Sequence, residues 1–184
     1  MIMDPYIAIA VGIALSRGPL EADGPNMPIA PTSTLSAHNF MPTGRLAVGL
    51  HKDSWDIELG SGPLSKRQIS RDGGQDVSGY NINESEWDVR ARYWLPVSGN
   101  FSVYGEGGAA AVRWTAARWT WASSEWPCGG GWASTQGWAV APQIGLGAGY
   151  DLSKQWKLTA GATQTFNANN VDTLQVMVGT RYSF

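Results

Sequence analysis

The chain has 184 residues, which suits one domain with a core and is too short for two domains of ordinary size. Its formal net charge of -2 gives no sign of a nucleic-acid partner, and the lack of any apolar run of about 18 residues excludes a transmembrane helix. The single cysteine, Cys128, cannot form an internal disulfide. Glycine (23 residues) and tryptophan (10 residues) are both abundant.

The first predicted element is the segment IAIAVGIALS, which could be mistaken for the apolar part of a signal peptide. Asp4 and Pro5 stand where a signal peptide would carry Lys or Arg. The segment also alternates, with Ile, Val and Leu on one face and Ala and Gly on the other. It is therefore predicted to be a strand, and any export signal is expected to have been removed.

The same alternation recurs along the chain. It appears in RLAVGL, WDIELG, WDVRARYWL, FSVYGEGGAAAV, GWAVAPQIGLGAGY, WKLTAGATQ and LQVMVGTRYSF. One face of each segment carries large apolar residues, and the other carries glycine, alanine and a few polar or charged residues. Together with the first segment, these make eight predicted strands.

The connections between these strands alternate in length. Short connections cover residues 51–54, 96–100 and 151–155, and long ones cover about 17–43, 61–85, 115–136 and 166–172. An even number of strands with tight turns at one end and long loops at the other is typical of bacterial membrane barrels. The sequence therefore predicts an all-β fold, an eight-stranded antiparallel up-and-down transmembrane β-barrel, as a single domain over 1–184.

The polarity of the two faces favours a membrane barrel over a soluble β-barrel or sandwich. Eight strands enclose room only for packed side chains, so the bulky aromatic residues fit better outside, against lipid. They also cluster near the turns, where aromatic belts meet the membrane interface. The predicted interface residues are Trp55, Trp87, Tyr93, Trp138, Tyr150, Trp156, Tyr182 and Phe184.

Three stretches carry a family resemblance: YWLPVSGNFSVYGEGGAA, IGLGAGYDLSKQWKL and the ending VGTRYSF. They resemble the OmpA-like family of eight-stranded outer-membrane barrels, which includes the opacity-type surface proteins, most strongly from about residue 87 onward. The resemblance implies an integral protein of the bacterial outer membrane with periplasmic termini, in contact with the bilayer and lipopolysaccharide. It also implies insertion by the outer-membrane assembly machinery, for which Phe184 looks like the terminal aromatic signal.

Eight charged residues fall on the inward face of the predicted barrel. Four are basic and four acidic: Arg45, Arg90, Arg92, Arg181, Asp56, Glu58, Asp88 and Glu106. Unpaired charges in a narrow interior would be strongly destabilising, so a paired network is expected. The network either fills the interior or acts as a gate whose exchanging partners open a small aqueous path.

A catalytic role has little support in the sequence. His38 and His51 have no obvious neighbouring nucleophile, and neither shows the His-x-Ser arrangement of the family's lipid A deacylases. Asp72 and Asp76 are too loosely spaced for a calcium loop. No catalytic, metal or cofactor site is therefore predicted, and a lipid-modifying enzyme is the weakest of the functional hypotheses.

The third long loop is the strongest candidate for binding. It contains an aromatic, slightly basic patch made of Arg118, Trp119, Trp121, Trp126 and Trp132. Such a patch suits contacts with proteins, sugars or lipid head groups. Alternatively, its tryptophans belong to strands that project beyond the membrane and extend the interfacial belt. The predicted function is a non-enzymatic surface or structural protein acting through its outer loops, in adhesion or in contact with a host protein or other ligand. The alternative is a small gated pore.

Overall fold

Eight antiparallel strands make up the described part of the chain. The computed structural model describes residues 3–17, 39–71, 78–121, 130–168 and 171–184. The strands are β1 (Asp4–Arg17), β2 (Asn39–Lys52), β3 (Trp55–Arg71), β4 (Ser78–Ser98), β5 (Phe101–Trp121), β6 (Gly130–Asp151), β7 (Trp156–Ala168) and β8 (Val171–Ser183). No helix within these ranges is long and apolar enough to cross a membrane.

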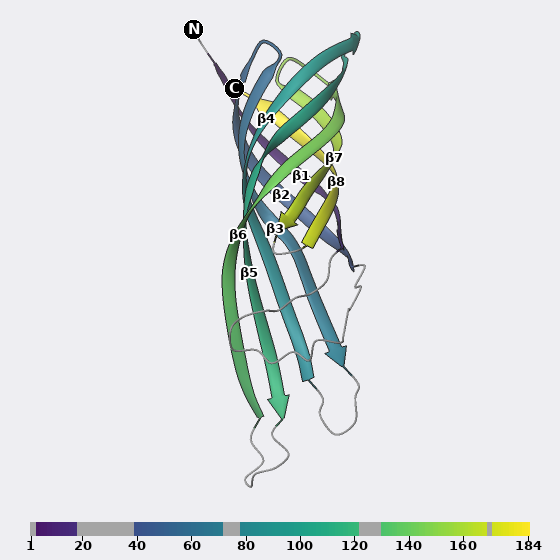
Figure 1. The fold of residues 1–184 in the computed structure, drawn as a ribbon. Helices are drawn as coiled ribbons and strands as arrows, with labels where there is room; N and C mark the ends of the chain where they lie inside the picture. Colours follow the sequence, from purple (N-terminus) through teal and green to yellow (C-terminus); the bar gives the residue numbers. More distant parts are fainter. Residues whose placement is uncertain (1–2, 18–38, 72–77, 122–129, 169–170) are drawn as a thin grey trace.

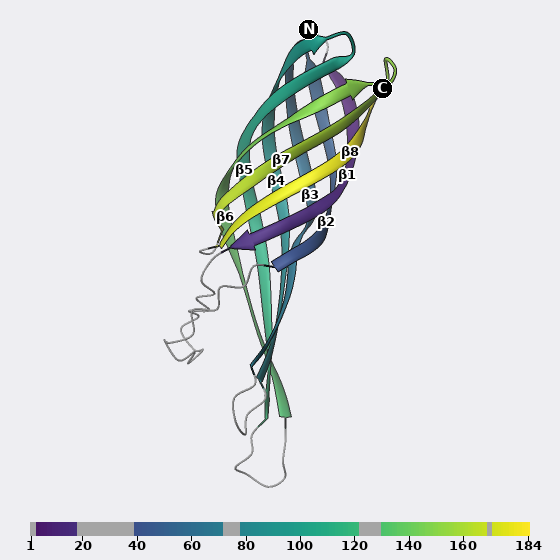
Figure 2. The same cartoon turned by 90° about the vertical axis from the view of Figure 1, so that its right-hand side faces the viewer.

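The strands close into a barrel in sequence order. Each strand pairs with its neighbours in the chain, and β1 pairs with β8 to complete the ring, with Tyr6 opposite Ser183 and Arg17 opposite Asp172 (Figure 2). All eight pairings are antiparallel. The predicted fold is thus confirmed.

Tight turns gather at one end of the barrel, which we call the turn end, and both termini lie there (Figure 1). Two residues join β2 to β3, and two join β4 to β5. Asp53 and Gly99, the first residue of each turn, have φ values of 56° and 51°. Glycine adopts this left-handed conformation readily and aspartate tolerates it, so both turns suit a two-residue hairpin.

The strands extend further than the sequence predicts at the opposite end, which we call the loop end. β3 continues to Arg71, β4 starts at Ser78, β5 continues to Trp121 and β6 starts at Gly130. The sequence predicts loops where the alternation of large apolar residues stops. The backbone pairing continues past that point, because β3 to β6 hydrogen-bond to one another without needing an apolar face.

These four strands form a sheet that projects beyond the barrel, and we call it the projecting sheet (Figures 1 and 2). Pairing of β3 with β2 ends at Ser61, and pairing of β6 with β7 ends at Gln143. Residues 62–71 of β3 and 130–142 of β6 therefore form the two edges of the projecting sheet.

The two faces of the strands have the predicted polarity. The large apolar residues point outward and are exposed, as at Val48, Trp87 and Leu146. The inward face is buried, and its charged residues have little solvent exposure. Lipid in place of water around the outer face explains this inversion of the usual protein surface.

A β-bulge brings one large apolar side chain into the barrel. The register shifts between Pro63 and Ser65, and the extra residue, Leu64, turns inward and is 1% exposed. Leu64 belongs to a buried apolar cluster with Ala110, Val112, Ala141 and Ala168. This cluster packs the interior towards the loop end.

The seam between β1 and β8 depends on a glycine. A Cβ atom at Gly12 would collide with the carbonyl oxygen of Val176 and the Cα atom of Met177. We therefore expect Gly12→Val to weaken closure of the barrel by roughly 1–3 kcal/mol, because backbone atoms cannot move aside as a flexible side chain can. The measurement is the folded fraction after refolding into lipid vesicles, read from the mobility shift of unheated protein on a denaturing gel.

The matched control for this seam is Gly105→Val. Nothing lies within 4 Å of a Cβ atom added at Gly105, because this position is on the outward face of β5. Equal folded fractions for the two variants would contradict the importance of close approach at the seam.

Candidate functional site

The interior of the barrel is filled by an ionic network. All eight charged residues predicted for the inward face are buried there. They come from β2, β3, β4, β5 and β8, so the network joins strands on different sides of the ring. Arg90, at 2% exposure, is the largest of the fully buried side chains.

Arg45 bridges two acids at the middle of the network. Its Nε donates to Asp88 Oδ2 at 2.9 Å and its Nη2 to Asp88 Oδ1 at 2.5 Å, a bidentate pair. Its Nη1 donates to Glu58. Glu58 also accepts from the hydroxyl of Tyr6 at 3.0 Å. Charge-assisted bonds of this kind offset the cost of removing the ions from water.

Glu106 forms a second centre between two arginines. Arg92 donates to Glu106 Oε2 from Nε at 3.1 Å and from Nη2 at 2.8 Å. Arg90 Nη1 reaches Glu106 Oε1 at 3.2 Å, and Thr163 donates to the same oxygen at 2.5 Å. Arg92 also lies 3.6 Å from Glu58, which links this centre to Arg45.

Asp56 gathers three donors near the turn end. Oδ2 accepts from Trp94 Nε1 at 2.6 Å and from Arg181 Nη1 at 2.8 Å. Oδ1 lies 2.6 Å from His51 Nδ1. Because the carboxylate holds this nitrogen, His51 is also a member of the network.

The network contains two acids beyond those predicted. Glu84 and Glu86 are also buried, so six acids and four arginines lie in the interior among the described residues, and the predicted balance of four each is wrong. Both belong to the same alternation as Asp88, in NESEWDVRAR, but the strand was predicted to begin only at Trp87. Extending the alternation by three residues would have found them.

Two side-chain amides stabilise the additional acid Glu86 by donating hydrogen bonds to it. Gln175 Nε2 donates to Glu86 Oε1 at 2.9 Å, and Gln143 Nε2 donates to Glu86 Oε2 at 3.2 Å. Gln143 also accepts from Arg90 Nε at 3.2 Å and so connects Glu86 to the arginines. Both glutamines come from the inward faces of their strands.

Little space remains inside the network. A cavity of about 40 Å³ lies among Arg45, Glu58, Arg90, Arg92 and Glu106, enough for a few water molecules at most. A much larger cavity of about 770 Å³ opens at the turn end. The described interior thus narrows from a wide mouth to a closely packed polar layer.

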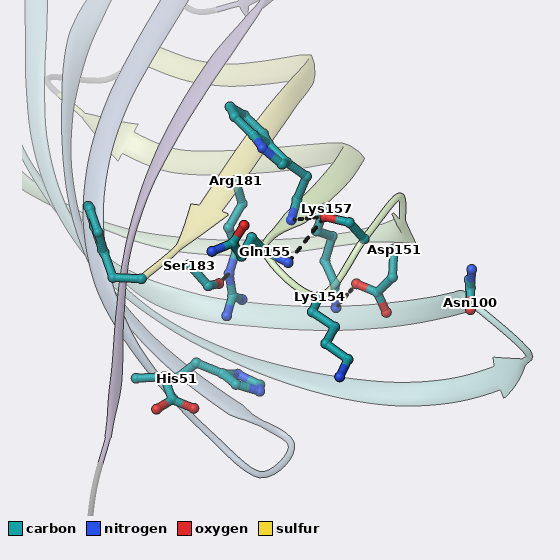
Figure 3. A pocket seen from close by; sticks show the side chains of 12 residues that line it. His51, Asn100, Asp151, Lys154, Gln155, Lys157, Arg181 and Ser183 are labelled. Atoms are coloured by element: carbon teal, nitrogen blue, oxygen red, sulfur yellow. Dashed lines mark hydrogen bonds and ion pairs between the residues drawn. The ribbon is translucent and has the colours of Figure 1, made fainter.

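The mouth at the turn end is polar and of mixed charge (Figure 3). His51, Lys154, Lys157 and Arg181 line it on the basic side, and Lys157 Nζ lies 3.4 Å from Asp151 Oδ1. Lys157 Nζ also lies 4.1 Å from the centre of the Trp94 ring, a cation–π distance. The mouth is therefore continuous with the network through Trp94.

The sequence of this closed and polar-filled barrel matches a known family. Residues 11–184 match the family model described as "Outer membrane protein beta-barrel domain". The chain belongs to this family. The OmpA-like outer-membrane barrel that the sequence resembles is thereby confirmed, with its location in the bacterial outer membrane.

Solved structures of other outer-membrane barrels share the fold. Ail, the attachment invasion locus protein of Yersinia pestis, is 14% identical with a TM-score of 0.52, covering 99% of this chain and 100% of that chain. Neisserial surface protein A is 10% identical with a TM-score of 0.61, covering 98% and 97%. OprG of Pseudomonas aeruginosa is 13% identical with a TM-score of 0.54, covering 99% and 97%. No curated protein matches the sequence.

The aromatic residues of this outer-membrane barrel lie at two levels on its outer face. Six of the eight predicted interface residues lie near the turn end, where ring centres of Trp156 and Tyr182 are 5.0 Å apart and those of Tyr182 and Phe184 are 5.3 Å apart. Trp87 and Trp138 are instead well along their strands, and their predicted position near the turns is wrong. The two levels match the two girdles of membrane barrels.

The predicted binding patch is divided between strands of the barrel. Arg118, Trp119 and Trp121 belong to β5 and Trp132 to β6, with Trp119 opposite Trp132 in the ladder. Their backbones therefore extend the projecting sheet, as in the alternative interpretation, and do not form a loop. Trp126 lies outside the described residues, as do His38, Cys128 and the pair Asp72 and Asp76.

Few candidate catalytic side chains lie in the described part of the barrel. His51 is held by Asp56, and no group of three or more His, Cys, Asp or Glu side chains in this part could hold a metal ion. The described residues near His51 include Ser183 on the rim of the mouth, but no hydrogen bond joins these two side chains.

The network makes a prediction about stability. Replacing Arg45 with Met leaves Glu58 and Asp88 buried without their main cation, so the free energy of unfolding should fall by about 3–5 kcal/mol. The measurement is urea-induced unfolding from lipid vesicles, followed by tryptophan fluorescence.

Lys154→Met serves as the control for the Arg45 variant. It removes the same charge from an exposed residue at the turn end and should change the free energy of unfolding by less than about 0.5 kcal/mol. Equal effects of the two substitutions would show that the buried pairs contribute nothing specific.

Proposed function

We propose that this protein is a non-enzymatic surface protein of the outer membrane that acts through its loop end, in adhesion or ligand binding. The observation that carries the proposal is the contrast between the packed interior and the projecting sheet. A polar layer with about 40 Å³ of free space leaves little room for solutes, whereas four strands continue past the barrel. We place the turn end and both termini in the periplasm and the projecting sheet outside the cell.

The composition of the projecting sheet favours an anionic or sugar-rich ligand. Its strand segments carry five basic residues: Lys66, Arg67, Arg71, Arg113 and Arg118. The acids of the same segments, Glu84 and Glu86, are buried towards the barrel interior. Basic residues among tryptophans suit sulfated or otherwise acidic polysaccharides, because charge attracts the anionic groups and aromatic rings pack on sugars.

A structural relative supports a test with a sulfated sugar. Ail of Yersinia pestis was solved in complex with the heparin analogue sucrose octasulfate, and its structure has a TM-score of 0.52 to this chain. At 14% identity this likeness concerns the fold alone. Heparin is therefore a reasonable first probe for this protein, and the basic residues of the projecting sheet supply the independent argument.

A gated pore is the second candidate. The arrangement that favours it is the sharing of acids between arginines, since Arg92 lies within reach of both Glu58 and Glu106. An arginine with two alternative partners can exchange them at little cost, which would let the layer rearrange. The wide mouth at the turn end would supply the aqueous entrance.

We also propose that Phe184 is the terminal aromatic read by the outer-membrane assembly machinery. Its side chain is 69% exposed at the end of the chain and contacts Tyr182 edge to face.

Shortening the β5–β6 hairpin tests the surface function. Trp114 and Gly137 are opposite each other in the ladder, so replacing residues 115–136 with a two-residue Asn-Gly turn preserves the register. The variant should fold as the parent does and lose most of its retention on immobilised heparin. Retention of the parent should fall as salt rises, because dissolved ions screen the attraction between basic residues and sulfate groups.

Charge substitutions provide the matched comparison. Replacing Lys66, Arg67 and Arg71 with Gln should weaken heparin retention, whereas replacing Lys52 and Lys154 at the turn end should not. Full retention by the shortened variant, or equal losses from both ends, would contradict a binding role for the projecting sheet.

A further inference from the structure

The outer face of β5 contains a trough of small residues. Gly105, Gly107, Ala109 and Ala111 occupy four successive outward positions. Within the residues whose side chains are described, β5 alone has such a run. The neighbouring strands β4 and β6 place large side chains on either side: Trp87, Val89, Tyr93, Val140, Ile144 and Leu146.

The large side chains of β4 and β6 project further from the barrel than the small residues of β5. Val140 is 78% exposed and Leu146 is 69% exposed, since the β5 residues opposite them are Ala111 and Gly105. Across β5, the same two residues face Trp87 and Tyr93. The result is an apolar channel, open outward, whose floor is backbone and methyl groups.

Arg113 ends the trough at the loop end. From Phe101 to Arg113 the strand advances roughly 40 Å, which at a tilt of about 45° is about 28 Å across the membrane. With Phe101 at the turn-end boundary of the hydrocarbon layer, Arg113 lies at the loop-end boundary, which the orientation proposed above places in the outer leaflet. It is the one charged residue on the outward face of β4, β5 and β6 among the side chains described there.

The guanidinium of Arg113 is held in place and remains accessible. Its Nη2 donates to Gln136 Oε1 at 2.9 Å, and its Cζ atom lies 5.9 Å from the centre of the Trp138 ring. The side chain is exposed, so its other donors are available to a ligand. Ser85 is directly opposite Arg113 on β4.

A hollow of about 490 Å³ adjoins Arg113. It lies where β3 leaves β2, close to the hydrogen bond that Thr43 donates to the carbonyl of Pro63 at 2.5 Å. Its polar lining on the outer side comes from Asn83, Ser85, Arg113 and Thr115. Glu84 lies on the inner wall, where a carboxylate can accept from hydroxyl or amide donors.

We propose that this surface binds one molecule of lipid A, the phosphorylated and multiply acylated glucosamine disaccharide of the outer leaflet. A phosphate binds Arg113, the sugar hydroxyls meet the polar lining of the hollow, and a saturated acyl chain lies in the β5 trough. Charge complementarity favours an anionic head group, and the hollow is too polar and too large for a phosphate alone. The site faces lipid and shares only Arg113 with the basic residues of the projecting sheet.

The experiment is native mass spectrometry of the delipidated, refolded protein in detergent, titrated with lipid A. The parent should retain one lipid A molecule. Arg113→Gln should weaken retention about tenfold through loss of a charge-assisted contact. Gly107→Leu should weaken it by filling the trough, and it should fold normally because the nearest atom to an added Cβ is the Gln143 carbonyl oxygen at 3.9 Å.

Matched controls separate the site from general effects. Lys154→Gln removes a positive charge at the turn end, and Ala160→Leu places a leucine at another position on the outward face. Both should retain lipid A as the parent does. Equal retention by all variants would overturn the proposal, as would equal retention of phosphatidylglycerol by the parent. A dimer that Gly107→Leu disrupts would show that the trough holds a second copy instead.

Discussion

The structure depends on one constraint: backbone groups inside a lipid layer have no water to bond with. The pairing of β1 with β8 satisfies that constraint by closing the ring, and the remaining features follow from the closure. Most large apolar residues face outward, because a ring of eight strands has little room for them inside. Close contact at the seam then requires a glycine at position 12.

The same closure explains the chemistry of the interior. Arginines and acids in a narrow, largely dry space must be paired, and pairing across the ring packs them into a layer that joins opposite walls. Arg90 illustrates this, since it contacts Asp88 on its own strand, Glu106 on β5, Gln143 on β6 and Thr163 on β7. A layer so connected ties β4, β5, β6 and β7 together across the barrel.

The sequence predicts the features that direct contact with lipid requires. Alternation is strict where one face meets hydrocarbon, so the outward residues of all eight strands and the eight inward charges could be found. Strand ends could not, because the hydrogen bonds of β3 to β6 continue where lipid no longer selects residues. Glu86 is a different case: the sequence alternation continues through it, but the predicted strand starts one residue later, at Trp87. The contact of His51 with Asp56 was missed because the shared carboxylate also depends on Trp94 and Arg181 from distant strands.

The most direct test of a packed interior is single-channel conductance in a planar bilayer, measured for the refolded protein and for Arg90→Ala. We expect no discrete steps from either, because the remaining pairs and the Leu64 cluster still fill the barrel. Discrete steps from the parent that grow in the variant would contradict the account and establish a gated pore.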